Sequence, residues 1–159
     1  MTVNVLFVCL GNICRSPTAH GLFQYHVDQA GLTNNIHVDS AGTGAWHAGN
    51  PPDDRAQSSA LEKGYDIGGL RARQVTAADF KKYDYILAMD KQNLIDLRVM
   101  CPTGYHGVLA LFLEAAGLKE MLEVPDPYYG GQEHFEHVIQ LVERGAENLL
   151  ARIQKEHTF

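Results

Sequence analysis

The sequence predicts an α/β fold, a single-domain three-layer sandwich in which a four-stranded parallel sheet carries helices on both faces. Two observations lead to this prediction. Short apolar stretches alternate along the chain with segments of helical periodicity, a pattern typical of βαβ units. The chain has 159 residues, of which 45% are hydrophobic and 20% charged, as is usual for one globular domain. We therefore expect one domain over residues 1–159.

The first strand and the first helix are the clearest elements. Residues 3–9 are apolar and β-branched without a helical period, which predicts a strand buried on both faces. A helix is expected over residues 17–30, where Ser16 can cap the first turn and Gly31 can end the helix. The connection between them then lies at the carboxyl edge of the sheet, where parallel sheets bind ligands.

The remaining elements alternate in the same way, and no repeat, linker or low-complexity run divides the chain. Residues 123–131 hold two prolines and two glycines, which predicts a loop. The other expected elements are strands over residues 36–41, 85–89 and 108–113, and helices over residues 54–63, 77–81, 90–98 and 133–156.

Charge and cysteine content exclude several classes of protein. Thirteen Lys and Arg against nineteen Asp and Glu give a net charge of −6, which argues against binding to nucleic acid backbones or anionic membranes. The three cysteines, Cys9, Cys14 and Cys101, are too few for a disulfide framework and favour a reducing compartment. The apolar start of the chain is too short for a signal peptide or membrane span. We expect a cytoplasmic protein that uses neither a metal nor a cofactor.

The loop after the first strand carries the strongest chemical signal. Residues 10–14, called the cradle loop below, separate Cys9 at the strand end from Arg15 at the helix start. Such a loop can turn its backbone N–H groups inward, and the helix N-terminus adds partial positive charge, so that an anion can bind. Arg15 can hold two anion oxygens, and the positive environment favours a thiolate at Cys9, which is suited to attack phosphorus. The alternative, a buried core cysteine, does not explain why these features coincide.

Five segments resemble one protein family, in the same order and along nearly the whole chain. The first, Val8-Cys9-Leu10-Gly11-Asn12-Ile13-Cys14-Arg15-Ser16-Pro17, resembles the signature of the low-molecular-weight protein tyrosine phosphatases. The others are Asp39-Ser40-Ala41-Gly42, Arg71-Ala72-Arg73-Gln74, Asp84-Tyr85-Ile86-Leu87-Ala88-Met89-Asp90 and Pro125-Asp126-Pro127-Tyr128-Tyr129-Gly130. The resemblance implies a phosphate-binding loop between the first strand and first helix, and hydrolysis of protein phosphotyrosine through a phosphocysteine intermediate.

The resemblance also implies which residue performs each step of the reaction. Cys9 attacks phosphorus, Arg15 binds the phosphate and stabilises the transition state, and Asp126 protonates the leaving oxygen and then activates water. From the sequence alone, Asp126 is equally consistent with an ordinary turn aspartate between two prolines. The phosphate-binding residues implied by the family are Leu10, Gly11, Asn12, Ile13, Cys14, Arg15 and Ser16.

Three polar side chains are implied to support the cradle loop. The Ser16 hydroxyl donates to the Cys9 sulfur and eases its departure in the second step, and Asn12 and Ser40 hydrogen-bond to keep the loop in shape. One departure from the family is visible, because many members carry His where this chain has Leu70. We therefore expect the hydrogen bonds that support the cradle loop to differ here from those of such members.

Aromatic residues are expected to shape the mouth of the pocket. The resemblance implies that Trp46 and Tyr128 form walls for a flat phosphotyrosine ring, with Tyr129 beside them. Core packing is the usual fate of a lone Trp, but Trp46 lies in a polar, Gly-rich stretch that favours exposure. Ile13 stands where protein-arginine phosphatases of the same superfamily typically carry Thr, which favours phosphotyrosine.

Further expectations concern redox chemistry and partners. Cys14 can trap an oxidised Cys9 as a disulfide and so protect it. The expected partners are a phosphotyrosine-containing protein or peptide, and inorganic phosphate or other oxyanions as product or inhibitor. His134 and His137 share a helical face, but a solvated helix start explains them better than a metal pair, and Arg71 and Arg73 are expected to be surface charges.

Three alternative functions compete with this interpretation. An arsenate reductase of the same fold needs a downstream pair of cysteines, and only Cys101 lies downstream. A protein-arginine phosphatase would share the cradle loop, and Ile13 argues against it. A non-enzymatic phosphate-binding module would lack the nucleophile or the acid, and Cys9 and Asp126 are both present.

Overall fold

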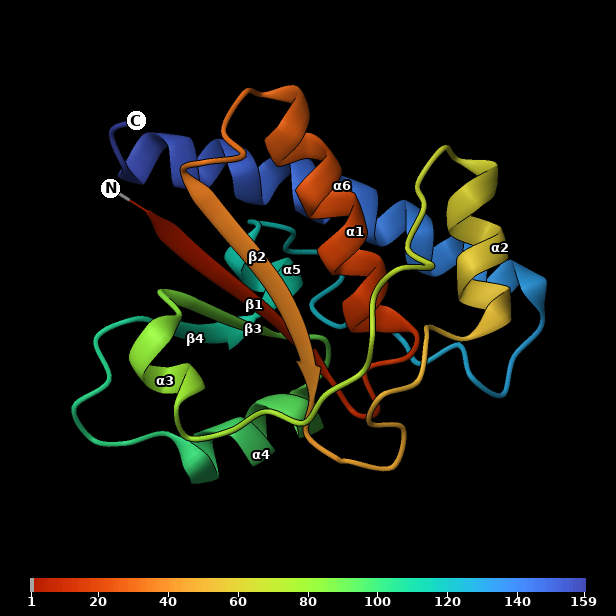
Figure 1. Ribbon diagram of the computed structural model, residues 1–159, viewed down its shortest axis with the longest axis horizontal. Coiled ribbons are helices and arrows are strands. Elements are labelled where there is room, and N and C mark those ends of the chain that lie inside the picture. The colour runs from red at the N-terminus through yellow and green to blue at the C-terminus, as the bar shows by residue number, and fades with distance from the viewer. Residues whose placement is uncertain (1) are drawn as a thin grey trace.

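The computed structural model describes residues 2–159 and shows a four-stranded sheet between layers of helices (Figure 1). The strands pair in the order β2-β1-β3-β4, and every pairing is parallel. The predicted fold class is confirmed. The elements are β1 Val3–Cys9, α1 Arg15–Gln29, β2 Ile36–Gly42, α2 Asp54–Glu62, α3 Asp79–Lys82, β3 Tyr85–Ala88, α4 Lys91–Met100, β4 Val108–Leu111, α5 Phe112–Ala115 and α6 Gln132–Glu156.

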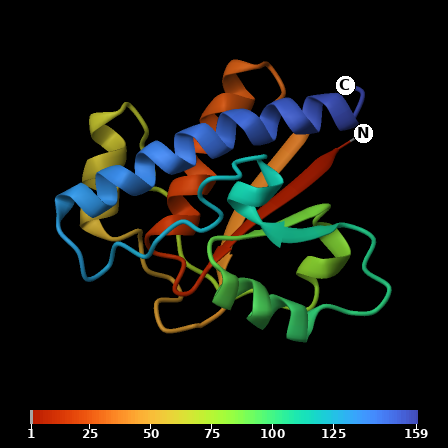
Figure 2. The ribbon, with the colours of Figure 1, turned by 180° about the vertical axis from the view of Figure 1, so that it is seen from behind.

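Each face of the sheet has its own hydrophobic cluster because successive side chains of a strand point to opposite faces. Val5 and Phe7 of β1 face α1, α5 and α6, whereas Leu6 and Val8 face α3 and α4. Figure 2 shows the long helix α6 lying across the first of these faces. Both clusters are buried, and β1 is apolar and buried except at Asn4, as expected for a central parallel strand.

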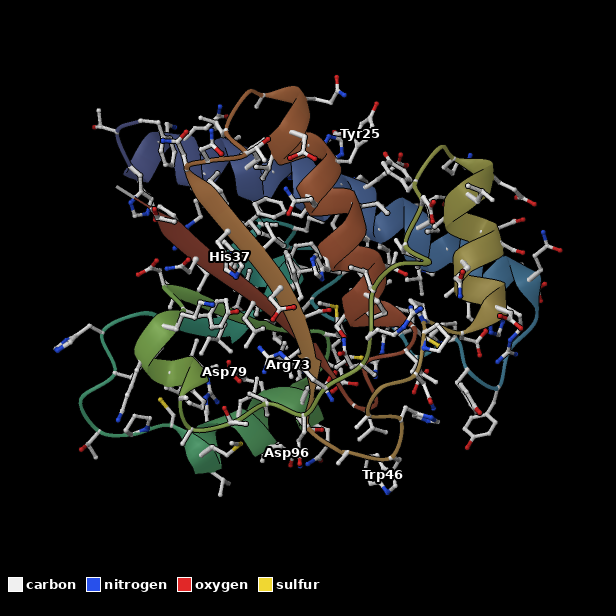
Figure 3. The ribbon with its side chains drawn as sticks, viewed as in Figure 1. Tyr25, His37, Trp46, Arg73, Asp79 and Asp96 are labelled. Atoms are coloured by element: carbon white, nitrogen blue, oxygen red, sulfur yellow. The ribbon has the colours of Figure 1, made fainter. Side chains whose placement is uncertain are left out.

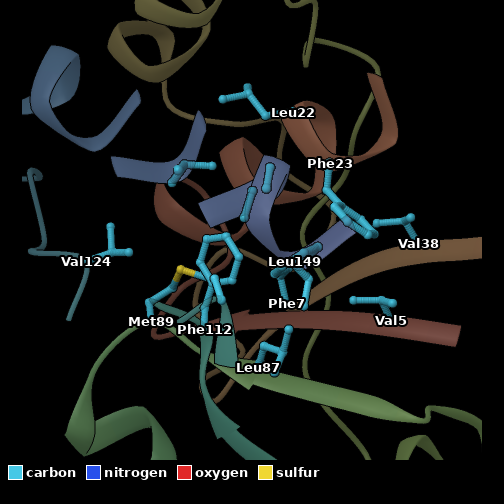
Figure 4. Packing of buried hydrophobic residues seen from close by; sticks show 14 of the residues in the cluster. Val5, Phe7, Leu22, Phe23, Val38, Leu87, Met89, Phe112, Val124 and Leu149 are labelled. Carbon is cyan, nitrogen blue, oxygen red and sulfur yellow. The ribbon is translucent and has the colours of Figure 1, made fainter. Parts of the chain in front are cut away.

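An aromatic group fills the larger cluster. The ring of Phe7 lies 5.6 Å from that of Phe23 in α1 and 5.1 Å from that of Phe112 in α5, both in edge-to-face geometry (Figure 4). These contacts hold α1 against β1 directly behind the cradle loop. Core packing therefore holds β1 and α1, the two elements that flank the cradle loop, against each other.

Two local predictions were wrong. Helix α1 begins at Arg15, so Ser16 is its second residue and not its cap. Strand β4 ends at Leu111. Residues 112 and 113, which were predicted as strand, belong to the short helix α5, Phe112–Ala115, and Phe112 lies in the core. An apolar stretch of this length is compatible with either structure, and packing decided it. None of the helices in residues 2–159 has the length and apolar composition needed to cross a bilayer.

Candidate active site

Cys9 lies at the inner end of a pocket at the carboxyl edge of the sheet. It is the last residue of β1 and only 3% exposed. Its sulfur accepts a hydrogen bond from the Asn12 backbone N–H at 3.2 Å and lies 3.0 Å from the Ser16 hydroxyl. The structure thus places the Cys9 sulfur in the pocket, within hydrogen-bond distance of two polar groups.

Asn12 holds the cradle loop in an unusual conformation. Its φ angle is 58°, in the left-handed region that asparagine tolerates better than most residues. Its side chain donates to the Ser16 hydroxyl at 2.7 Å and accepts from the Arg73 backbone N–H at 3.0 Å. The loop is therefore fastened both to α1 and to the segment that carries Arg73.

Arg15 is buried, with 3% of its side chain exposed, and points into the site from the first turn of α1. Its Nη1 donates to Asp90 at 2.6 Å and to the Val124 carbonyl at 3.1 Å. Burial lowers the pKa of Arg15, but the Cys9 sulfur and the carboxylates of Asp90 and Asp126 outweigh this and leave the pKa raised. The side chain stays charged and oriented for an anion.

Asp90 is a site residue that the sequence analysis did not assign a role. It caps α4 by accepting from the Asn93 backbone N–H at 2.8 Å while its other oxygen orients Arg15. It follows β3, which pairs with β1, so the two strand ends meet at the same edge of the sheet. An acidic residue directly after the neighbouring strand was the signal that could have identified it.

Asp126 comes from the loop between α5 and α6 and faces Arg15. Its Oδ2 lies 3.7 Å from Arg15 Nη2, its Oδ1 accepts from the Tyr128 backbone N–H at 3.0 Å, and the side chain is 43% exposed. A cavity of about 210 Å³ joins it to Cys9. The cavity is lined by Cys9, Leu10, Gly11, Ile13, Cys14, Arg15, Trp46, His47, Asp126, Tyr128 and Tyr129.

The predicted aromatic walls surround the mouth of this cavity. Trp46 is 72% exposed on the loop after β2, which agrees with the expectation that it lies outside the core, and it projects away from the protein in Figure 3. Tyr128 and Tyr129 face each other with ring centroids 5.0 Å apart. His47 also lines the cavity and was missed; its neighbour Trp46 was the available signal.

Ser40 and Arg73 are arranged differently from the predictions. The Ser40 hydroxyl lies 3.1 Å from His20 Nδ1, while Leu70 packs against the core. Arg73 is half-buried and ion-paired rather than a free surface charge: it donates to Asp39 at 3.1 Å and to both oxygens of Asp79 at 3.0 Å. Arg73 and Asp79 lie next to each other in Figure 3. This ion-pair cluster anchors the backbone N–H that binds Asn12.

Cys14 and the histidine pair complete the survey of the predicted residues. Cys14 is a free, buried thiol that lines the cavity, and Cys9 is free as well. Burial, and to a lesser extent Asp53, raise the pKa of the Cys14 thiol, which keeps it protonated. Exposed Glu133 lies 3.9 Å from His134, and within residues 2–159 no group of three His, Cys, Asp or Glu could hold a metal ion.

Comparisons with known proteins show the family of this chain. The family model described as low molecular weight phosphotyrosine protein phosphatase matches residues 4–158. The chain belongs to this family. It is accordingly a protein-tyrosine phosphatase, a hydrolase whose substrates are phosphoproteins.

Individual relatives are similar over almost the whole length. The low molecular weight protein-tyrosine-phosphatase YfkJ of Bacillus subtilis is 45% identical over 97% of both chains, and the human family member is 43% identical over 87% of this chain and 88% of its own. Among solved structures, YfkJ superimposes with a TM-score of 0.92 at 43% identity, covering 99% of this chain and 98% of its own. A Drosophila arginine phosphatase has a TM-score of 0.88 at 31% identity, covering 96% and 99%.

Proposed function

We propose that this phosphatase hydrolyses protein phosphotyrosine through a phosphocysteine intermediate, with Cys9 as nucleophile, Arg15 as phosphate ligand and Asp126 as general acid and base. The observation that carries the proposal is one cavity with Cys9 and Arg15 at its inner end and Asp126 beside them. A buried guanidinium, backbone N–H groups and a helix N-terminus can bind three phosphate oxygens there.

The first step forms a sulfur–phosphorus bond at Cys9 and breaks the bond between phosphorus and the tyrosine oxygen. The leaving oxygen takes the proton of Asp126. The cradle loop and Arg15 stabilise the charge that spreads over the phosphoryl oxygens.

In the second step, water attacks phosphorus and gives its proton to the Asp126 carboxylate. Inorganic phosphate and the Cys9 thiolate are released. The Ser16 hydroxyl, 3.0 Å from the sulfur, can donate to the departing thiolate. The aromatic walls at Trp46 and Tyr128 suit a flat ring that reaches inward to the phosphate site.

Aryl phosphate hydrolysis by the wild type, Cys9→Ser and Asp126→Ala tests the proposal. Cys9→Ser is expected to abolish turnover, because an alcohol at this position is a poor nucleophile at neutral pH. Asp126→Ala is expected to lower kcat by about 10²–10⁴-fold, as for other lost general acids. Equal activity of the three proteins would overturn the mechanism.

A peptide comparison separates phosphotyrosine from the rival substrate. Phosphoarginine is the rival substrate because the chain is similar to a Drosophila arginine phosphatase. Ile13, which lines the cavity with a bulky apolar side chain, favours phosphotyrosine instead. We expect phosphotyrosine peptides to be hydrolysed in preference to phosphoarginine and phosphoserine peptides of the same sequence. Preference for phosphoarginine would refute this choice.

We also propose that Cys14 protects the nucleophile from oxidation. Peroxide converts the Cys9 thiolate to a sulfenic acid, and the Cys14 thiol condenses with it to form a disulfide and water. After peroxide and then excess thiol, the wild type should recover most of its activity and Cys14→Ser much less. Equal recovery of both proteins would contradict the role of Cys14.

A further inference from the structure

Arg55 is held rigidly beside the pocket, although it does not line it. It lies in the first turn of α2, whose cap is Asp53. One carboxylate oxygen of Asp53 accepts from the Arg55 backbone N–H at 2.8 Å and from Nε at 3.1 Å, and the other accepts from Nη2 at 3.0 Å. This two-pronged contact fixes the plane of the guanidinium.

The start of α2 is itself attached to the cradle loop. The Asp53 backbone N–H donates to the Ile13 carbonyl at 2.8 Å. The guanidinium of Arg55 is therefore oriented by a residue that is hydrogen-bonded to the phosphate-binding loop.

On its other side, Arg55 stacks on two aromatic rings. Its Cζ lies 5.4 Å from the centroid of the Tyr128 ring and 4.7 Å from that of Phe135. Phe135 is buried in the first turns of α6, so it is a fixed support, whereas Tyr128 belongs to the irregular loop before α6. A cation over both rings ties the loop residue to the fixed one.

Tyr128 connects this contact to the acid. The Tyr128 ring lines the cavity, and its backbone N–H donates to Asp126 at 3.0 Å. A shift of Tyr128 would thus move one wall of the pocket and remove a hydrogen bond from the Asp126 carboxylate. The contact of Arg55 with Tyr128 therefore affects both the pocket wall and the hydrogen bond to Asp126.

We propose that Arg55 is a positioning residue of the phosphatase reaction, which holds Tyr128 as a pocket wall and, through its backbone N–H, orients Asp126. This inference rests on the proposed function, in which Asp126 protonates a leaving oxygen. In this role, the Asp53–Arg55 pair fixes the position of the loop that carries Asp126 relative to the cradle loop.

Two substrates distinguish this role from a structural one. An aryl phosphate needs both the aromatic wall and the acid, whereas acetyl phosphate has no ring and releases acetate, which needs no protonation. Arg55→Met should lower kcat/KM for the aryl phosphate about three- to tenfold, the size of a lost cation–π contact. The kcat/KM for acetyl phosphate reports only the steps up to the release of acetate, before Asp126 acts on water, and should stay at the wild-type level. Equal losses on both substrates, or no loss on either, would refute the proposal.

A double-mutant cycle and a matched control complete the test. If Arg55 acts through Tyr128, Arg55→Met should cost nothing further in a Tyr128→Ala background; an undiminished effect there would refute the proposal. Arg98→Met changes an exposed arginine on α4 and should leave both activities unchanged. Failure of the proposed function is seen separately, as activity on either substrate that survives Cys9→Ser.

Discussion

The inner end of the pocket and its mouth differ in how firmly their side chains are held. Cys9, Arg15 and Ser16 are almost fully buried and lie on or next to packed elements. Trp46 and Tyr129 are 72% and 95% exposed and lie on loops. The inner end must present a charge and N–H groups in one geometry, so it is preorganised by folding. The mouth is formed by exposed side chains on loops and has fewer such constraints.

This difference predicts that the same kind of substitution has very different effects at the two ends. A change at the inner end removes contacts that act on the transition state, and so lowers kcat. A change at the mouth removes contacts made equally in the ground and transition states, and so raises KM.

The largest effect is expected from Arg15→Lys. Lysine keeps the charge but loses the planar fork that contacts Asp90 and can hold two phosphate oxygens. We expect kcat for an aryl phosphate to fall about 10²–10³-fold, the range seen when a preorganised transition-state contact is lost. Steady-state kinetics check this, with Arg98→Lys as a control. A change confined to KM would contradict the role given to the inner end.

His20, whose ring lies 3.1 Å from the Ser40 hydroxyl, should make the stability of the protein depend on pH. Burial lowers the pKa of His20 to about 4; Asp39 opposes this shift, while His37 and Arg73 add to it. Between this value and about 6.5, the unfolded chain binds a proton that the folded chain does not, so stability falls as the pH falls.

His20→Gln removes this titration while keeping a partner for Ser40. Relative to the variant, the wild type should lose about 2–3 kcal/mol of unfolding free energy between pH 7 and pH 4. Denaturant unfolding at each pH measures the difference between the two curves, which removes the contribution of all other groups. Parallel curves would show that His20 does not stay neutral in the folded protein.

The sequence was sufficient to place Cys9 and Arg15 at the inner end of the pocket because the two residues are close together in the chain. A strand, a five-residue loop and a helix start follow one another, so Cys9 and Arg15 could be assigned from spacing alone. Asp90 and Arg73 were not assigned because their roles depend on strand order, which brings residues 75 and 61 positions away in the chain against Arg15 and Asn12. The pairing of His20 with Ser40 likewise depends on how α1 packs against β2.

Ser16 shows how a local rule can fail where function intervenes. A serine before a proline at a helix start is a typical cap. Here the helix begins at Arg15, two residues earlier than predicted, and the hydroxyl instead contacts the Cys9 sulfur and the Asn12 side chain. The Ser16 hydroxyl, which would normally cap the helix, therefore makes its hydrogen bonds within the site.

The smallest effect is expected from Trp46→Ala at the mouth. The side chain is largely exposed, so its removal should change the free energy of unfolding by less than about 0.5 kcal/mol. Loss of aromatic stacking should raise KM for a phosphotyrosine peptide about three- to tenfold with kcat nearly unchanged. Val99→Ala, an exposed substitution on α4, is the matched control. A fall in kcat comparable to that of Arg15→Lys would mean that the mouth also acts on the transition state, and the contrast between the two ends would be lost.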